Sequence, residues 1–191
     1  MAHRCAALFL LATVAAACGD NLAADGAIEL LDAAPSSDAT VDTTPLAGER
    51  CDDAQPVTLR GVSGATTLSA TILASLGGYH ADYAPHCTTQ DELGADRVYR
   101  VTIPAGHRLD AKLSPTFPAA LYVLAGPAAS CAAACLAGEA IAATDQAFLS
   151  HDNTTGAPED VFVVVDTVTE LAAQGDFRLA LRQSPTPVVA P

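Results

Sequence analysis

The feature that most constrains the fold is the alternation of apolar and polar residues over positions 96–114, interrupted only at residues 104–106. Side chains of a strand point alternately to its two faces, so the alternation places one apolar set on one face of each arm. The apolar set is Tyr99, Val101, Ile103, Leu109, Ala111 and Leu113. The opposite, polar set is Arg100, Thr102, Asp110 and Lys112. The pattern predicts a β-hairpin with its turn at Pro104 to Gly106, and each half-buried strand needs a second sheet over its apolar face.

Short apolar runs separated by turn residues recur after Cys51 and predict further strands. These are residues 57–59, 65–72, 119–124, 147–150, 160–165 and 176–181, with a long loop over 77–96 and a small cysteine loop after Gly126. Residues 161–165 are apolar on both faces, which predicts a central strand. Phe177, Leu179 and Leu181 alternate with Arg178 and Arg182, which predicts a strand with one solvated face. With no helical period visible, we predict an all-β fold: an antiparallel β-sandwich or jelly roll of about eight strands.

Composition limits the chain to one core and excludes one class of partner. The 191 residues are 50% hydrophobic but only 5% aromatic, which suffices for one modest core of about 120 to 140 residues. The net charge is −13 and the single lysine is Lys112. A surface this acidic disfavours nucleic acid as a partner, because phosphate backbones need a basic patch.

The N-terminus predicts export. Arg4 precedes an apolar run over residues 6–14 that is too short to span a bilayer, and small residues follow it up to Ala17. We therefore predict a signal peptide over residues 1–17. Cys18 then resembles the cysteine of the bacterial lipobox, although Ala15 stands where that motif usually has leucine. The resemblance implies lipidation of Cys18 and a lipid anchor in the bacterial envelope, with the outer membrane as the expected location; the alternative is ordinary cleavage after Ala17.

The predicted domain boundaries follow from composition. Residues 18–47 are rich in Ala, Asp, Ser, Thr and Pro and hold no aromatic residue, so they cannot bury enough surface to offset their chain entropy. We predict the lipidated cysteine and a disordered linker there, a β-sandwich domain over 48–183, and a disordered tail over 184–191.

Four cysteines remain for the domain and predict disulfides in an oxidising compartment. They are Cys51, Cys87, Cys131 and Cys135. Three pairings are possible. A helical or turn-like spacing of four residues would bring Cys131 within disulfide range of Cys135. That arrangement leaves Cys51 to pair with Cys87; a four-thiolate zinc site is disfavoured because Cys-x-x-Cys knuckles are absent.

Five segments together resemble the bacterial pre-peptidase C-terminal domain. They are residues 48–54, 96–106, 119–124, 161–166 and 175–181, and the resemblance extends over about residues 48–183. It implies a β-sandwich with a non-catalytic accessory role; some members accompany secreted proteases, and a few bind calcium or polymeric substrates such as collagen. No protease domain precedes the module here, so we expect a free-standing lipoprotein.

Candidate metal ligands are few and weakly arranged. His80, Asp82 and His86 could hold a divalent ion, although their spacing matches no standard zinc site. Two oxygen-rich groups could hold calcium but lack a standard calcium loop. They are Asp91, Glu92 and Asp96, and Asp152, Asn153, Glu159 and Asp160. Solvated loop charge is the alternative for each group, and we predict no cofactor beyond possible calcium.

The sequence predicts a protein that is not an enzyme. No nucleophile elbow is present, because residues 61–65 lack its final glycine, and Asp42 and Asp166 lack the glycine of an aspartic-protease pair, which favours a surface or strand-end position for both. We predict a binding or interaction module of the cell envelope whose partner is an unknown envelope protein or glycan. The alternatives are a structural envelope component with no small ligand, or an accessory factor of a separate secreted hydrolase.

Overall fold

The computed structural model describes residues 46–82, 87–90, 92, 94–127, 135–169 and 175–187. Within them the chain forms nine strands and no helix, so no helix there could cross a membrane. The strands are β1 (Gln55–Pro56), β2 (Leu68–Ser75), β3 (Asp96–Ile103), β4 (His107–Pro115), β5 (Ala119–Ala125), β6 (Cys135–Ile141), β7 (Ala147–Asp152), β8 (Glu159–Thr167) and β9 (Asp176–Pro185). The predicted all-β sandwich is confirmed.

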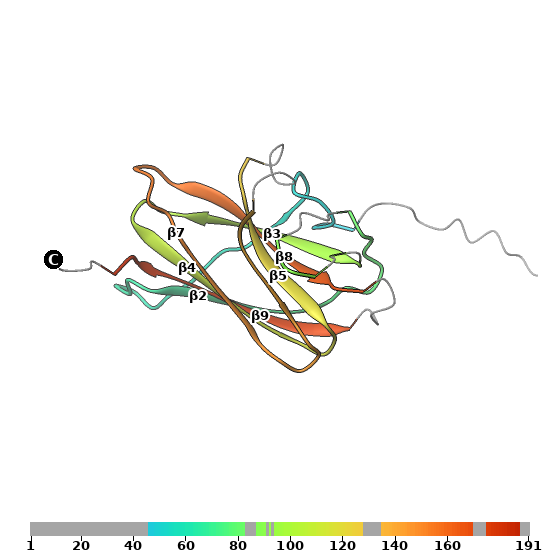
Figure 1. The fold of residues 1–191 in the computed structure, drawn as a ribbon. Coiled ribbons are helices and arrows are strands. Elements are labelled where there is room, and N and C mark those ends of the chain that lie inside the picture. Colours follow the sequence, from blue (N-terminus) through green and yellow to red (C-terminus); the bar gives the residue numbers. More distant parts are fainter. Residues whose placement is uncertain are drawn as a thin grey trace, which may run out of the picture. The chain divides into compact units, whose positions relative to one another are not determined.

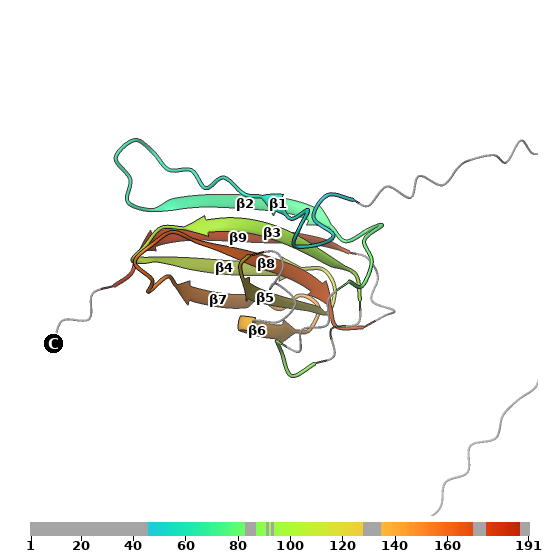
Figure 2. The ribbon, with the colours of Figure 1, turned by 90° about the horizontal axis from the view of Figure 1, so that it is seen from above.

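Two sheets face each other across one main core (Figure 1). The five-stranded sheet has the order β1-β3-β8-β5-β6, and the four-stranded sheet has the order β2-β9-β4-β7. β1 and β3 run parallel, and all the other pairs of neighbouring strands are antiparallel. Strands β1 and β2 lie at one edge of the sandwich, and β6 and β7 lie at the other (Figure 2).

The predicted hairpin over residues 96–114 is wrong, although its two faces were assigned correctly. β3 pairs with β8 in one sheet, and β4 pairs with β9 and β7 in the other. Residues 104–106 therefore carry the chain from sheet to sheet, with Gly106 at a φ of 68°. All six predicted apolar residues are buried in one core, where the two arms cover each other. Alternation determines which face of a strand is buried but does not identify the neighbouring strand.

The central position of residues 161–165 is confirmed. They lie in β8, the middle strand of the five-stranded sheet, and are buried on both faces. One face meets the main core, and on the other Phe162 and Val164 pack with Tyr122 and Cys51 in a second cluster. Asp166, predicted at a surface or strand-end position, lies at the end of this strand but is 0% exposed.

The ends of several predicted elements differ from the structure. The first strand is β1, before the predicted residues 57–59, and β6 occupies part of the region predicted as a cysteine loop. β9 continues to Pro185, two residues into the predicted tail. The signal peptide, Cys18 and residues up to 45 of the linker lie outside the described residues. Their assignments stay predictions.

The predicted pairing of the cysteines is wrong. Cys87 forms a disulfide with Cys135, with 5.6 Å between their Cα atoms. Cys51 is also disulfide-bonded, and Cys131 lies outside the described residues. The prediction assumed a turn at Cys135, whereas this residue begins strand β6 beside β5. Gly138 brings β6 against the backbone of Cys87, where a Cβ atom would collide with the Cys87 carbonyl group.

Candidate functional site

The outward side of the four-stranded sheet is the candidate site, and we call it the open face. It is formed by alternate residues of β2, β9, β4 and β7, whose other residues point into the core. The strand register arranges these outward residues in rows, three of which form the centre of the open face. The rows are Leu73, Arg178 and Ser114; Thr71, Ala180, Lys112 and Phe148; and Ser69, Arg182, Asp110 and Ser150.

Two large apolar side chains of the open face are left in solvent. Leu73 is 78% exposed and Phe148 is 59% exposed. They lie on the two edge strands of the sheet, β2 and β7. The Lys112 ammonium group lies 4.9 Å from the centre of the Phe148 ring, a cation–π distance that holds the lysine over the aromatic ring. Exposed apolar groups bordered by polar ones are typical of interaction surfaces.

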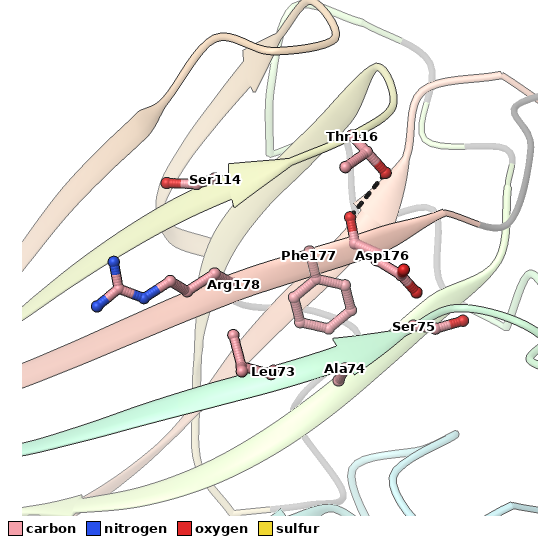
Figure 3. Close-up of a pocket in the computed structure, with 8 residues that line it drawn as sticks. All are labelled: Leu73, Ala74, Ser75, Ser114, Thr116, Asp176, Phe177 and Arg178. Carbon is pink, nitrogen blue, oxygen red and sulfur yellow. Dashed lines mark hydrogen bonds between the residues drawn. The ribbon is translucent and has the colours of Figure 1, made fainter.

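Two depressions hollow the open face. One has a volume of about 570 Å³ and lies between the ends of β2, β9 and β4 (Figure 3). Leu73, Ser114 and Arg178 line it, and Thr116 closes one side by donating a 2.9 Å hydrogen bond to the Asp176 carbonyl oxygen. The second, of about 400 Å³, is lined by residues of the other two rows, including Phe148. The open face therefore carries two separate depressions, one at each set of rows.

Three cations of the open face are available to a ligand. Within the described part of the chain, no carboxylate forms an ion pair with Lys112, Arg178 or Arg182. A fourth cation, Arg108, is occupied: its guanidinium group donates two hydrogen bonds, of 2.7 and 2.6 Å, to Asp152. This contact lowers the pKa of the Asp152 carboxyl group.

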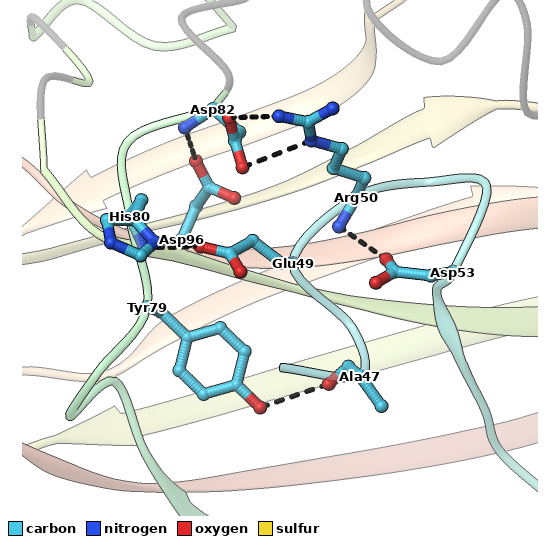
Figure 4. A network of polar contacts seen from close by, with 8 residues as sticks. All are labelled: Ala47, Glu49, Arg50, Asp53, Tyr79, His80, Asp82 and Asp96. Carbon is cyan, nitrogen blue, oxygen red and sulfur yellow. Dashed lines mark hydrogen bonds and ion pairs between the residues drawn. The ribbon is translucent and has the colours of Figure 1, made fainter. Parts of the chain in front are cut away.

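The residues predicted to hold zinc make contacts with other partners (Figure 4). His80 Nδ1 contacts Glu49 Oε1, and its backbone N–H donates to the same oxygen at 2.9 Å. Asp82 faces the Arg50 guanidinium group at 3.2 Å. His86 lies outside the described residues. These contacts join the segment before β1 to the segment before β3, and no group of metal-binding side chains is found among the residues the structure describes.

The second predicted calcium group is also engaged internally. Asp152 binds Arg108, Glu159 Oε2 lies 3.1 Å from His151 Nε2, and Asp160 accepts a 2.5 Å hydrogen bond from Thr102. Asn153 is buried, and its amide group donates to the carbonyl oxygens of Ile103 and Ala157. Hydrogen bonds and ion pairs within the domain therefore account for the positions of these four side chains.

The first predicted calcium group lies partly in a buried acidic cluster. Glu92 and Asp96 are both buried, whereas Asp91 lies outside the described residues. The sequence did not reveal that Asp166 joins them, opposite Asp96. Tyr122 donates a 2.9 Å hydrogen bond to Asp166. Burial, followed by the charge of Asp96, raises the pKa of Asp166 to about 8. Calcium at this cluster stays a prediction.

No protein-family model matches this chain, and no curated protein matches it. Among solved structures it is similar to PliG of Aeromonas hydrophila, a periplasmic inhibitor of g-type lysozyme, with 16% identity, coverage of 69% of this chain and 96% of that one, and a TM-score of 0.43. A disulfide-linked pilus protein of Bacillus endospore appendages gives 12% identity, coverage of 68% and 98%, and a TM-score of 0.36. A family two carbohydrate esterase of Cellvibrio japonicus has 15% identity, with coverage of 63% of this chain and 37% of that one, and a TM-score of 0.25.

These TM-scores are too low to transfer a function to this chain. The resemblance to the pre-peptidase C-terminal domain stays a prediction from the sequence motifs.

Proposed function

We propose that this chain is an exported, non-catalytic binding module, held at the bacterial envelope by a lipid on Cys18, and that the open face is its binding surface. The observation that carries the proposal is the exposure of Leu73 and Phe148 on the same face as three cations without ion-pair partners in the described structure. Exposed apolar side chains beside unpaired cations are typical of a binding surface, and a face that only spaces the domain is not expected to combine them.

Two features support export. The N-terminal sequence has the charge, apolar run and small residues of a leader followed by Cys18. The folded domain also contains the Cys87–Cys135 disulfide, a type of bond that persists in oxidising compartments outside the cytoplasm. The membrane anchor itself rests on the resemblance of Cys18 to a lipobox cysteine.

The binding role is tested on an array of envelope glycans and peptides probed with the full-length protein. We expect the double variant Leu73→Ser/Phe148→Ser to lose the bound signal. Val62→Ser is the matched control, because Val62 is 82% exposed but lies outside the open face. Loss of signal with both variants, or with neither, would contradict the open face as the binding surface. An array without any bound probe would favour the structural role.

The anchor is tested separately by the intact mass of the protein made in a bacterial host. A diacylglyceryl-sized increment on Cys18, absent from Cys18→Ala, is the expected result. A mature chain without this increment would contradict lipidation and leave the binding role to be judged on the array alone.

A further inference from the structure

We infer that the ligand of the open face is an acidic polysaccharide, a linear glycan of uronic acids. This inference rests on the binding role proposed above and adds the chemistry of the ligand. It follows from the charge of the face, the spacing of its cations and the kind of surface that a sheet face presents.

The charge of the open face is unlike that of the rest of the chain. Four of the nine Lys and Arg residues project from β4 and β9 on this side, whereas only three of the 22 Asp and Glu residues of the chain project from its strands here. Asp152 is paired with Arg108, so Asp110 and Asp176 are the remaining acids against three cations, and the face keeps a net positive charge. An anionic ligand is therefore attracted to this side of an otherwise acidic protein.

The available cations form a line suited to a repeating anion. Arg178 and Arg182 are four residues apart on β9, so their Cα atoms are separated by about 13 Å at the usual rise of a strand. Lys112 lies beside Ala180, midway between them and one strand away. A linear uronic-acid chain has one carboxylate on each sugar, so several carboxylates of one chain reach these three cations together. Arginine adds a planar fork of donors that matches a carboxylate.

The surface is better suited to a glycan than to an acidic peptide. The backbone groups of the inner strands β9 and β4 are already paired within the sheet. A peptide bound across this face would find no ladder partner for its own backbone N–H and C=O groups, whereas peptides recognised by sheets add to an edge. The face offers side-chain hydroxyl groups, which both donate and accept hydrogen bonds as sugar hydroxyls require. These belong to Ser69, Thr71 and Ser114, whereas the hydroxyl group of Ser150 donates to Asp110.

The experiment is calorimetric titration of the full-length protein with an oligogalacturonate and with its methyl ester, which has the same sugar backbone without free carboxylates. We expect the free acid to bind and the ester to bind at least about tenfold more weakly. The double variant Arg178→Gln/Arg182→Gln should weaken binding of the free acid by about tenfold, because each exposed ion pair contributes modestly. Arg100→Gln is the matched control, since Arg100 is exposed on the five-stranded sheet.

If the free acid and the ester bound equally well, and neither bound to Leu73→Ser/Phe148→Ser, the requirement for an acidic ligand would be overturned. The open face would then be retained as the binding surface. Poly-glutamate binding at least as tightly as the oligogalacturonate would overturn the glycan as the ligand class. Failure of both oligosaccharides to bind would also overturn the acidic glycan as the ligand. If the glycan and peptide array nevertheless showed bound probes, the proposed binding function would be retained without this ligand.

Discussion

Asp96 of β3 lies directly opposite Asp166 of β8, and both side chains are fully buried. Glu92 is buried close enough to add its charge, and Tyr122 donates a hydrogen bond to Asp166. Placing carboxyl groups together away from water favours the protonated form of at least one of them. The pKa of Asp166 is accordingly raised to about 8, with burial as the largest cause.

The raised pKa predicts that the free energy of unfolding falls as pH rises. An unfolded aspartate loses its proton near pH 3.9, whereas Asp166 in the folded state keeps it until about pH 8. Between these values the folded state binds more protons, so stability declines across this window and levels off above it. Asp166→Asn should remove this decline and add several kcal/mol near pH 8.

The measurement for Asp166→Asn is urea unfolding at a series of pH values from about 5 to about 9. Asp160→Asn serves as the control, because Asp160 is exposed on the same strand. A pH slope that Asp166→Asn leaves unchanged would show that another group controls the stability in this range.

Two buried tyrosines should respond in opposite ways to loss of the hydroxyl group. The Tyr99 hydroxyl has no hydrogen-bond partner among the described residues, whereas the Tyr122 hydroxyl donates to Asp166. Tyr99→Phe should therefore leave stability unchanged or raise it by about 1 kcal/mol, and Tyr122→Phe should lower it by about 1–2 kcal/mol. Denaturant midpoints of the two variants provide the comparison. The same sign of change in both would contradict the assigned hydrogen bonding.

The Cys87–Cys135 disulfide should contribute strongly to stability. It joins residues separated by 48 positions, and closing a loop of this length removes about 4 kcal/mol of chain entropy from the unfolded state. The double variant Cys87→Ser/Cys135→Ser should lose about that amount in urea unfolding without reductant. Thr88→Ala, next to Cys87, controls for local changes. A double variant as stable as the parent would contradict this contribution.

Asn153 should be one of the most sensitive polar positions. Its side chain donates to Ile103 O and Ala157 O and accepts from the N–H and the hydroxyl group of Thr155. Asn153→Ala removes these contacts from a buried site and should cost about 3 kcal/mol. Amide hydrogen exchange should also quicken around residues 103–107. Thr154→Ala, at an exposed neighbour, should change neither measurement.

The faces of the strands could be predicted from the sequence because burial follows alternation. Tyr99 and Leu113 were correctly assigned to the core, and Arg178 and Arg182 to a solvated face. Strand neighbours could not be predicted in this way, since alternation looks the same in a hairpin and in two strands of opposite sheets. This is why β3 and β4 were wrongly paired.

The candidate site was harder to predict because it joins distant parts of the chain. Leu73 lies opposite Arg178, and Lys112 lies opposite Phe148, only after the strands are placed in order. The burial of Asp166 was also hidden, since an aspartate at the end of an apolar run usually reaches solvent. The apolar residues on both faces of β8 were the available signal that its end is covered.

The strand order has a consequence for the order in which the sheets are completed during synthesis. β8 lies between β3 and β5, and β9 lies between β2 and β4, so the last two strands in sequence are the inner members of the two sheets. Among the described strands, a chain emerging from its N-terminus can form only the β1–β3, β4–β7 and β5–β6 ladders of the final sheets until β8 emerges. The sandwich therefore cannot close until the last two strands, β8 and β9, have been synthesised.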